Sequence, residues 1–579
     1  MKKKALSLLL VLLVASCNNT SSKDVSSSNP SSINNSSTSS SSSINNSSTS
    51  SSSSIDDVTE IEPWLKGETV EGNPLIYNLT VDQVEAFMKR LESAKVMVES
   101  ETNFDEFKKT YDDATTMIYS LLNASEMESV KYDIYGNSAN LDLSSTFDNY
   151  YYDIMEWFNV VEHLAFNNSF KSKLFPGLSD DLIVEIIGQN YPSEYYAVQK
   201  ELNDLENQFR NLDYDGDDYY SNVDDIYVNY VNASNNMAET YLNDYTNYMD
   251  YAYENIYYRD FTMLDASDFY NYVIEYVVPV CETLHREYMD NYRSLSDDDK
   301  ELFRSFIFGN GFTDDFSYIE DYRDFMGGDY QEAFDNLFNV NGGNYYISYE
   351  DDAYQGAYMT MLGEEGNRYP MVYYGNGYQS YQTIVHEFGH YFEAIMNGEH
   401  ELSYDLAESQ SQGNEYLFLE YLAQNKFANN GDITPLAKAI IYRFLSQSCE
   451  LIVLATLVDH IEQLCYNTIE LKKGDLEQYV LNEYEAHPEL KAIYPASSAY
   501  LYIQEVTMLS PCYYISYATS LIAAMNVNKI AENDLNKGKE AYLKLINHPN
   551  KEDFIEVCEY AGLSNPFKEE TFISLLSNY

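Results

Sequence analysis

The residues with the clearest chemical potential are two histidines four positions apart, with a glutamate between them. The sequence from His386 reads His-Glu-Phe-Gly-His and ends at His390. On a helix, side chains four residues apart lie one above the other, so the two imidazoles can reach one metal ion. Glu387 then lies beside the metal without binding it, where it can take a proton from an attacking water. The pattern predicts a catalytic site with one zinc ion per chain and Glu387 as general base.

The helix that must present this motif has recognisable ends. Ser380 is a suitable N-cap residue, and Asn397-Gly398 is a typical stop signal. The apolar residues between them recur at helical spacing: Val385, Phe388, Phe392 and Ile395. Two histidines on a solvent-exposed helix would not need apolar neighbours on both sides, so the pattern favours a buried metal site.

A catalytic zinc site needs a third protein ligand and leaves a fourth position open. The extended motif that supplies this ligand from the same helix is absent, because Glu393 and Met396 occupy its last two fixed positions. We therefore expect the ligand in the next helical segment, residues 403–419. A polar stripe interrupts the apolar pattern of that segment: Asp405, Glu408, Ser411, Gln412 and Glu415.

Glu408 is the predicted third ligand, and Glu401 is the rival candidate. Asp405 and Glu415 are predicted to orient a histidine through its other ring nitrogen, as the outer partners of metal ligands do. With Glu387 as base, this set predicts metal-assisted hydrolysis.

At this point the sequence resembles the oligoendopeptidase F and thimet oligopeptidase family. The resemblance rests on the His386–His390 motif and on Asp405-Leu-Ala-Glu408 followed by Ser411 and Glu415. Two further segments match in kind: Gly356-Ala357-Tyr358, which precedes a short strand at Pro370–Tyr374, and the tyrosine-rich run Pro511–Thr519. Together the matching pieces span about residues 350–525.

The resemblance implies a mainly α, two-lobed helical metallopeptidase with a small β-sheet beside the His-Glu-x-x-His helix and a deep substrate channel. It implies an oligoendopeptidase that hydrolyses short unfolded peptides. The implied substrate-binding residues are Gly356, Ala357, Pro370 and Val372, and the Pro370–Tyr374 strand is expected to pair with the substrate main chain.

Tyr513 and Tyr517, four apart in the tyrosine-rich run, are predicted to donate to the oxyanion, since a phenol stays protonated at neutral pH. Ordinary packing is the alternative in a chain with 58 tyrosines.

The sequence also departs from the family pattern. Glu393 stands where a further histidine is usual, and the interval from His386 to Glu408 is 22 residues, shorter than usual. Val506 and Thr507 occupy the region where another histidine commonly precedes the tyrosine-rich run. A catalytically weak or inactive peptide-binding lipoprotein of the same fold is therefore the alternative. A carboxydipeptidase that acts on chain ends is a second possibility within the enzyme class.

The N-terminus predicts export and a lipid anchor. Three lysines and an apolar run lead to Ser16-Cys17, which fits a lipoprotein signal peptide over residues 1–16 and lipidation at Cys17. Residues 17–57 are rich in Ser and Asn and form a predicted disordered tether. The expected location is the extracellular face of a bacterial cytoplasmic membrane. A surface adhesin could also carry such a tether, but that function would leave the zinc motif unexplained.

Composition bounds the remaining possibilities. The formal net charge of −59 argues against nucleic-acid binding and against electrostatic docking to anionic lipid. Helical periodicity dominates from Thr80 onward, and we expect a helical N-terminal lobe at 58–265 and a zinc peptidase domain at 266–579.

The expected partners are short peptides and, through Cys17, the membrane, and the chain is expected to be a monomer. Calcium binding at residues 213–218 is disfavoured, because the glycine is misplaced for a calcium loop.

Overall fold

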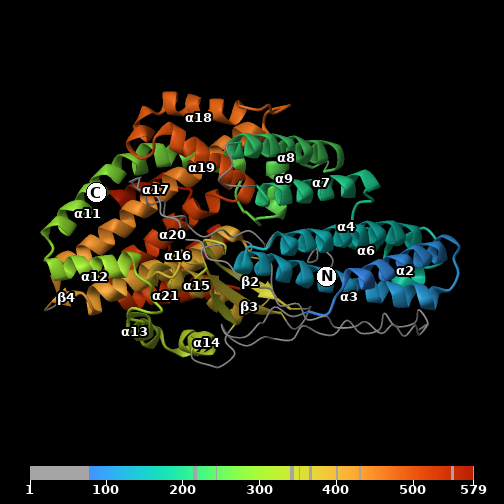
Figure 1. Cartoon of the computed structure of the whole chain (residues 1–579), viewed down its shortest axis with the longest axis horizontal. Coiled ribbons are helices and arrows are strands. Elements are labelled where there is room, and N and C mark those ends of the chain that lie inside the picture. The colour runs from blue at the N-terminus through green and yellow to red at the C-terminus, as the bar shows by residue number, and fades with distance from the viewer. Residues whose placement is uncertain are drawn as a thin grey trace, which may run out of the picture.

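The computed structural model describes residues 77–212, 218–242, 244–338, 344–350, 353–363, 368–398, 402–429, 432–549, 553–577 and 579. Within them the chain is mostly helical, with one three-stranded sheet and one two-stranded sheet. The predicted mainly α fold with a small sheet is therefore confirmed (Figure 1).

Three long helices near the N-terminus form a bundle with its own apolar core. They are α2 (Val81–Glu99), α3 (Phe104–Tyr135) and α4 (Ser138–Phe166), which lie side by side in Figure 1. Their buried apolar side chains, such as Phe107 and Trp157, form a cluster distinct from the main core. Thr80, where the helical periodicity begins, caps α2, since its hydroxyl accepts a hydrogen bond from the Gln83 amide at 3.3 Å.

A second group of helices follows: α5 (Lys171–Leu174), α6 (Asp180–Ile187), α7 (Ser193–Arg210), α8 (Tyr219–Tyr241), α9 (Tyr248–Asn255) and α10 (Met263–Tyr272). The helical periodicity of the sequence continues past the end of α8, but the chain forms two separate helices here, α8 and α9. Asn247 caps α9 by accepting from the Asp250 amide at 3.0 Å. Asparagine favours such caps over helix interiors, which explains the break.

The rest of the chain builds the main core. Its helices are the π-helical turn Val273–Val277, α11 (Val278–Ser294), α12 (Asp297–Phe308), α13 (Ser317–Met326), α14 (Gly328–Phe338), α15 (Tyr381–Asn397), α16 (Tyr404–Asn425), α17 (Pro435–Tyr466), α18 (Asp475–Ala486), the 3₁₀ turn Pro488–Ala492, α19 (Ala496–Leu509), α20 (Ile515–Asn533), α21 (Leu535–Asn547), α22 (Phe554–Ala561) and α23 (Glu569–Leu576). The main core also contains side chains of α7 to α10, from Tyr195 onward. It therefore includes residues on both sides of position 265, and the domain boundary placed there stays a prediction.

α17 is the one helix in the described ranges with the length and apolar content of a membrane span. The most apolar 18-residue stretch of α17 is 67% buried inside the protein, as is typical of a core helix.

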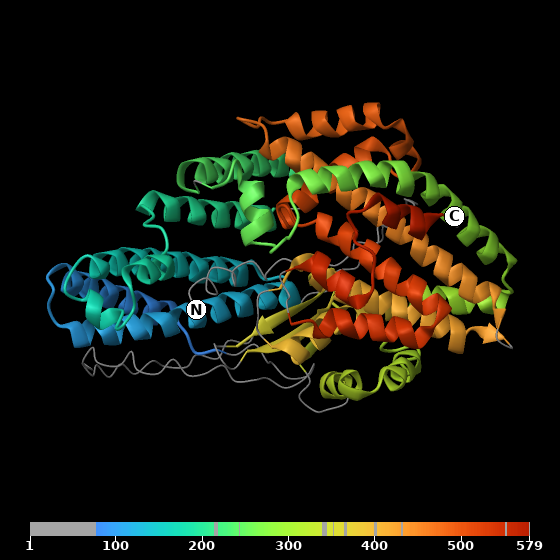
Figure 2. The ribbon, with the colours of Figure 1, turned by 180° about the vertical axis from the view of Figure 1, so that it is seen from behind.

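The strands form a small sheet beside α15, with β3 in the middle (Figure 2). β1 (Tyr345–Ile347) pairs with β3 (Tyr369–Tyr374) in parallel, and β2 (Ala357–Leu362) pairs with β3 antiparallel. A two-stranded ribbon, β4 (Ala428–Asn429) and β5 (Asp432–Ile433), follows α16. The sheet connects the bundle to α15, since β2 contacts α3 and both β2 and β3 contact α15.

Candidate metal centre and active site

The ends of the motif helix α15 are as predicted. Ser380 caps it by accepting a hydrogen bond from the Thr383 amide at 3.2 Å. Gly398 ends it with a φ of 66°, a left-handed conformation that favours glycine. All of the motif residues between these caps lie in one regular helix, so His386 and His390, four residues apart, lie on the same face of α15.

α15 and α16 cross at Gly389, inside the motif. A Cβ atom at Gly389 would lie 2.7 Å from Cα of Ser411, closer than real Cβ atoms approach. The two backbones can come this close only because the residue has no side chain. Asn414 strengthens the contact, donating from Nδ2 to the Val385 carbonyl at 2.8 Å. The crossing brings the histidines of α15 beside the carboxylates of α16.

His386, His390 and Glu408 converge at this crossing. Oε2 of Glu408 lies 3.6 Å from Nε2 of His386 and 3.9 Å from Nε2 of His390. One ligand atom from each of the three residues lies within 4.8 Å of the other two. All three side chains are buried. Two imidazoles and one carboxylate form the donor set of many catalytic zinc sites.

The atoms around this centre fit a divalent cation. Nε2 of His390 and Oε2 of Glu387 are buried and have no hydrogen-bond partner within the part of the chain that the structure describes. Buried polar atoms are nearly always paired, so these two require an additional group. A cation held by His386, His390 and Glu408 would satisfy Nε2 of His390 and leave Glu387 beside it as a non-ligand.

A chain of carboxylate and amide groups orients His386. Its Nδ1 lies 2.5 Å from Oε1 of Glu415, and Gln382 donates from Nε2 to Oε2 of Glu415 at 2.6 Å. The structure thus places Glu415 against a histidine, where the sequence predicts it. Sequence reasoning missed Gln382, although its position one turn before His386 on α15 was a usable signal.

Burial and neighbouring charges shift the pKa values in this site. Burial raises the pKa of Glu387 to about 8, against the opposing charge of His386. Burial alone would lower the pKa of His386, but the charge and hydrogen bond of Glu415 raise it to about 10. Burial lowers the pKa of His390 well below its usual 6.5, and the charge of His386 adds to this. In the metal-free centre His390 is therefore neutral, whereas His386 is protonated and paired with Glu415, so a metal ion must displace the proton on Nε2 of His386.

Tyr513 contacts the predicted ligand directly, and its hydroxyl donates to Oε1 of Glu408. Burial, together with the charge of Glu408, raises the pKa of Tyr513 well above its usual value, so the phenol keeps its proton. The ring of Tyr517 packs edge-on against Tyr513, with centroids 5.1 Å apart. The structure thus places Tyr513 in contact with the proposed ligand Glu408, and Tyr517 in contact with Tyr513.

Asp405 contacts neither histidine. Its Oδ2 lies 3.4 Å from Nε of Arg259, and its Oδ1 accepts from the hydroxyl of Thr519. Arg259 and Asp405 are both fully buried. The prediction that Asp405 orients a histidine is wrong in this geometry, because the carboxylate faces α20 and Arg259. Sequence reasoning did not single out Arg259.

The expected strand pairing with a substrate needs a correction. β3, which contains Pro370 and Val372, lies between β1 and β2, so both of its edges are occupied and it cannot add a substrate strand. β2 pairs with β3 alone among the described strands, which leaves its other side at the sheet edge. Ala357 begins β2, and the carbonyl of Gly356 accepts from the Gly375 amide at 2.7 Å.

Some predicted features lie outside the described residues. They are the signal peptide, the lipidation site Cys17, the tether, the rival ligand Glu401 and nearly all of the disfavoured calcium segment, residues 213–217.

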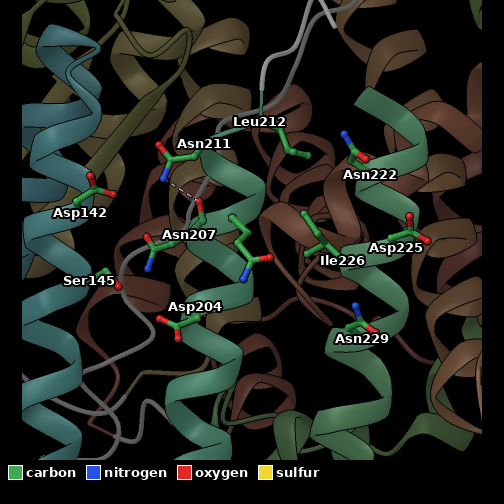
Figure 3. Close-up of a pocket in the computed structure, with 11 residues that line it drawn as sticks. Asp142, Ser145, Asp204, Asn207, Asn211, Leu212, Asn222, Asp225, Ile226 and Asn229 are labelled. Atoms are coloured by element: carbon green, nitrogen blue, oxygen red, sulfur yellow. Dashed lines mark hydrogen bonds between the residues drawn. The ribbon is translucent and has the colours of Figure 1, made fainter. Parts of the chain in front are cut away.

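A surface cavity of about 650 Å³ lies between α4, α7 and α8, and none of its lining residues belongs to the metal centre (Figure 3). It is lined mainly by carboxamide and carboxylate groups, most of them exposed, and Asn211 donates to the carbonyl of Asn207 within its own helix. Catalytic groups usually converge in a sheltered cleft, so this cavity gives no second active site.

The fold and the centre together fit the architecture of a helical metallopeptidase. No curated protein matches the sequence. Solved structures share the fold. One is described as an oligoendopeptidase F from Bacillus anthracis strain Ames, and it superposes with a TM-score of 0.57 at 16% sequence identity. The match covers 87% of this chain and 96% of the Bacillus chain. PZ peptidase A, solved with an inhibitor, has a TM-score of 0.60 at 14% identity, covering 86% of this chain and 96% of its own.

Residues 331–575 match the sequence profile of peptidase family M3. The chain therefore carries an M3 peptidase domain, and the predicted family is confirmed. The match contains both helices of the metal centre, and a zinc-dependent peptidase family agrees with the His-His-Glu donor set. At the level of the family, the protein is a peptide hydrolase.

Proposed function

We propose that this protein is a zinc-dependent oligoendopeptidase that hydrolyses short unfolded peptides. The observation that carries the proposal is the convergence of His386, His390 and Glu408 beside Glu387, whose Oε2 is buried and has no partner among the described residues. His386, His390 and Glu408 would hold one zinc ion per chain. The bound ion would supply Lewis-acid chemistry, which polarises a peptide carbonyl and acidifies water.

Glu387 is the proton-transfer group of the proposed reaction. Its carboxylate takes a proton from the attacking water as the oxygen bonds to the scissile carbonyl carbon. It then gives that proton to the leaving amine as the carbon–nitrogen bond breaks. Burial of Glu387 suits both steps, because its Oε2 is sheltered and has no other partner among the described residues, which leaves it available to the water.

The substrate main chain is proposed to lie along β2, the edge strand that begins at Ala357. Backbone pairing tolerates many side chains, so broad specificity is expected. Tyr513 would keep Glu408 in place, because its one hydroxyl proton is donated to Oε1 of Glu408. It would donate to the developing oxyanion only after giving up that bond. Tyr517, which packs on Tyr513, is a second candidate donor.

The decisive test compares the full chain with its Glu387→Gln variant on a library of quenched fluorescent peptides. We expect cleavage by the wild type, loss of cleavage with a chelator and in the variant, and one zinc ion bound per chain by both. Because the amide that replaces the carboxylate cannot act as a base, the loss should reach at least about a hundredfold in kcat.

Zinc binding by both proteins without any cleavage would overturn the peptidase proposal. It would favour the peptide-binding lipoprotein, which the departures at Glu393 and at Val506–Thr507 suggest.

We also propose that a lipid at Cys17 anchors a monomeric enzyme to the outer face of the cytoplasmic membrane. The basic start, the short apolar run and Ser16-Cys17 support this location. Cys17→Ser should abolish labelling by a fatty acid and move the protein from the membrane fraction to the medium. A wild-type chain that takes up no fatty acid would contradict the anchor.

A further inference from the structure

The turn between α19 and α20, which carries Tyr513, has a strained backbone. Cys512 in this turn has a φ of 61°, a left-handed backbone value that residues other than glycine rarely adopt. Such strain persists only where surrounding contacts enforce it, and it tends to occur at functional sites. The next residue is Tyr513, whose hydroxyl donates to the proposed ligand Glu408. Whatever fixes this turn therefore fixes Tyr513 as well.

Arg259 contacts the turn through several bonds at once. Its guanidinium donates to the Cys512 carbonyl at 2.9 Å, to the Tyr513 carbonyl at 3.2 Å and to the Ser516 hydroxyl at 3.0 Å. Its Nε lies 3.4 Å from Asp405 on α16, three residues before Glu408. Only the planar fork of an arginine can bind two carbonyls, a hydroxyl and a carboxylate together.

The loop that carries Arg259 is itself built around the turn. The guanidinium lies over the rings of Tyr253 and Tyr257, at 4.2 and 4.6 Å from their centroids. The Tyr257 hydroxyl donates to the Pro511 carbonyl. Tyr258, between Tyr257 and Arg259, has a φ of 49°. Two of the four non-glycine residues with positive φ in the described part of the chain thus flank this one contact.

We propose that Arg259 is a positioning residue that holds Tyr513 on Glu408 and thereby sets the affinity of the metal centre. It contacts neither the metal ligands nor the expected path of a substrate, and it acts through the turn. The zinc site assumed here rests on the proposed function, whereas the contact between Arg259 and the turn does not.

Arg259→Lys is the informative variant. A lysine keeps the positive charge beside the buried Asp405 but cannot bind both carbonyls of the turn. Full removal of the charge would leave Asp405 buried and unpaired, which would destabilise the whole protein and hide the effect. Arg443→Lys is the matched control, because Arg443 lies over the ring of Tyr288 and is in no contact with the turn.

The first measurement is the zinc affinity of the metal-free full chain, by competition with a chelator. Partners of metal ligands typically contribute about 10- to 100-fold to affinity, so Tyr513→Phe should weaken zinc binding at least about tenfold. Arg259→Lys should weaken it by a similar factor. The double variant should be no weaker than either single one, because both changes remove the same interaction. Arg443→Lys should bind zinc as the wild type does.

The second measurement is hydrogen exchange of the metal-free chain, which needs neither zinc nor activity. Arg259→Lys should accelerate exchange at Cys512–Ser516 and leave the later turns of α20 unchanged. If Arg259→Lys fails to fold, Tyr257→Phe takes its place in both measurements, because it removes only the hydrogen bond from the Tyr257 hydroxyl to the Pro511 carbonyl. It should produce a smaller shift of both readouts in the same direction.

Wild-type zinc affinity in Arg259→Lys, or losses that multiply in the double variant, would overturn the proposal. If Arg259→Lys does not fold, unchanged hydrogen exchange together with unchanged zinc affinity in Tyr257→Phe would also overturn the proposal. Absence of peptide cleavage by the wild type would refute the proposed function alone, since neither readout depends on catalysis.

Discussion

At the scale of single residues, the metal centre depends on side chains that touch the ligands rather than on the ligands alone. Glu415 contacts Nδ1 of His386 and leaves Nε2 free to face Glu408. Gln382 in turn holds the second oxygen of Glu415. These bonds fix the ring orientation of His386 and keep its Nε2 directed toward Glu408 before a metal ion binds.

This arrangement predicts the effect of Glu415→Gln. The amide removes the negative charge beside His386 and weakens the hydrogen bond that orients its ring, so zinc affinity should fall about 10- to 100-fold. Chelator competition measures the change. Glu420→Gln is the matched control, because Glu420 is buried on the same helix but bonds to Gln424. Equal zinc affinity in Glu415→Gln and in the wild type would contradict the orienting role.

Glu393, which replaces a histidine usual in the resembling family, has a local role instead. Its Oε1 accepts from Nδ2 of Asn397 at 2.9 Å, and the same nitrogen lies 3.0 Å from the Ile546 carbonyl on α21. Asn397 therefore ties the end of α15 to α21, and Glu393 holds the Asn397 side chain in place. The departure leaves the three residues that converge on the metal centre intact.

At the scale of elements, the site is the product of one helix crossing. α15 supplies two histidines and the base, α16 supplies two carboxylates, and Gly389 permits the approach. A side chain there must push α15 away from Ser411 or bend one of the helices. Either response would move the histidines relative to Glu408.

Gly389→Ala should therefore destabilise the fold and the metal centre together. Overpacking of this kind costs about 1–3 kcal/mol, more than alanine gains in helix propensity. Urea unfolding and zinc affinity would measure the two effects. Gly413→Ala on α16 is the matched control: the nearest atom to its added Cβ is Cδ2 of Tyr542 at 3.5 Å, an ordinary contact. We expect Gly413→Ala to be neutral or slightly stabilising, and a similar loss in both variants would refute the crossing argument.

At the scale of the whole molecule, the high negative charge extends into the N-terminal bundle. Glu126 on α3 and Asp148 on α4 are buried, and Glu126 accepts from the hydroxyl of Thr360 on β2. Burial raises the pKa of Glu126 to about 7, despite the opposing effects of Thr360 and Arg368. Burial likewise raises the pKa of Asp148 to about 6, against hydrogen bonding by Ser125.

These shifts predict that the bundle is most stable in mild acid. Between about pH 4 and 7 the folded chain binds more protons at Glu126 and Asp148 than the unfolded chain does. Their contribution to stability is thus complete below about pH 4 and is lost as the pH rises through 6 and 7. We expect a lower unfolding midpoint at pH 8 than at pH 5.

The variants that test this assignment are Glu126→Gln and Asp148→Asn. Each should reduce the difference in unfolding midpoint between pH 5 and pH 8, because its amide does not titrate. Glu92→Gln on the exposed side of α2 serves as the control and should leave the difference unchanged. An undiminished pH dependence in both buried variants would show that other groups cause it.

The sequence by itself determined the chemistry of the motif. The spacing of His386 and His390, the caps at Ser380 and Gly398 and the polar stripe of α16 are local patterns, because helix geometry converts sequence distance directly into a shared face. The confirmed family and the mainly α fold followed from the same signals. Glu408 and Glu415 could be selected because carboxylates on an apolar helix need a polar partner.

Only the tertiary structure decided which partner each polar group has. Asp405 and Glu415 look equivalent on one stripe, yet Glu415 contacts His386 while Asp405 contacts Arg259, 146 residues earlier. The central place of β3, which excludes it from substrate pairing, depends on β1 and β2 reaching its two edges. Contacts between distant segments depend on how the helices pack, and no spacing within one helix encodes that packing.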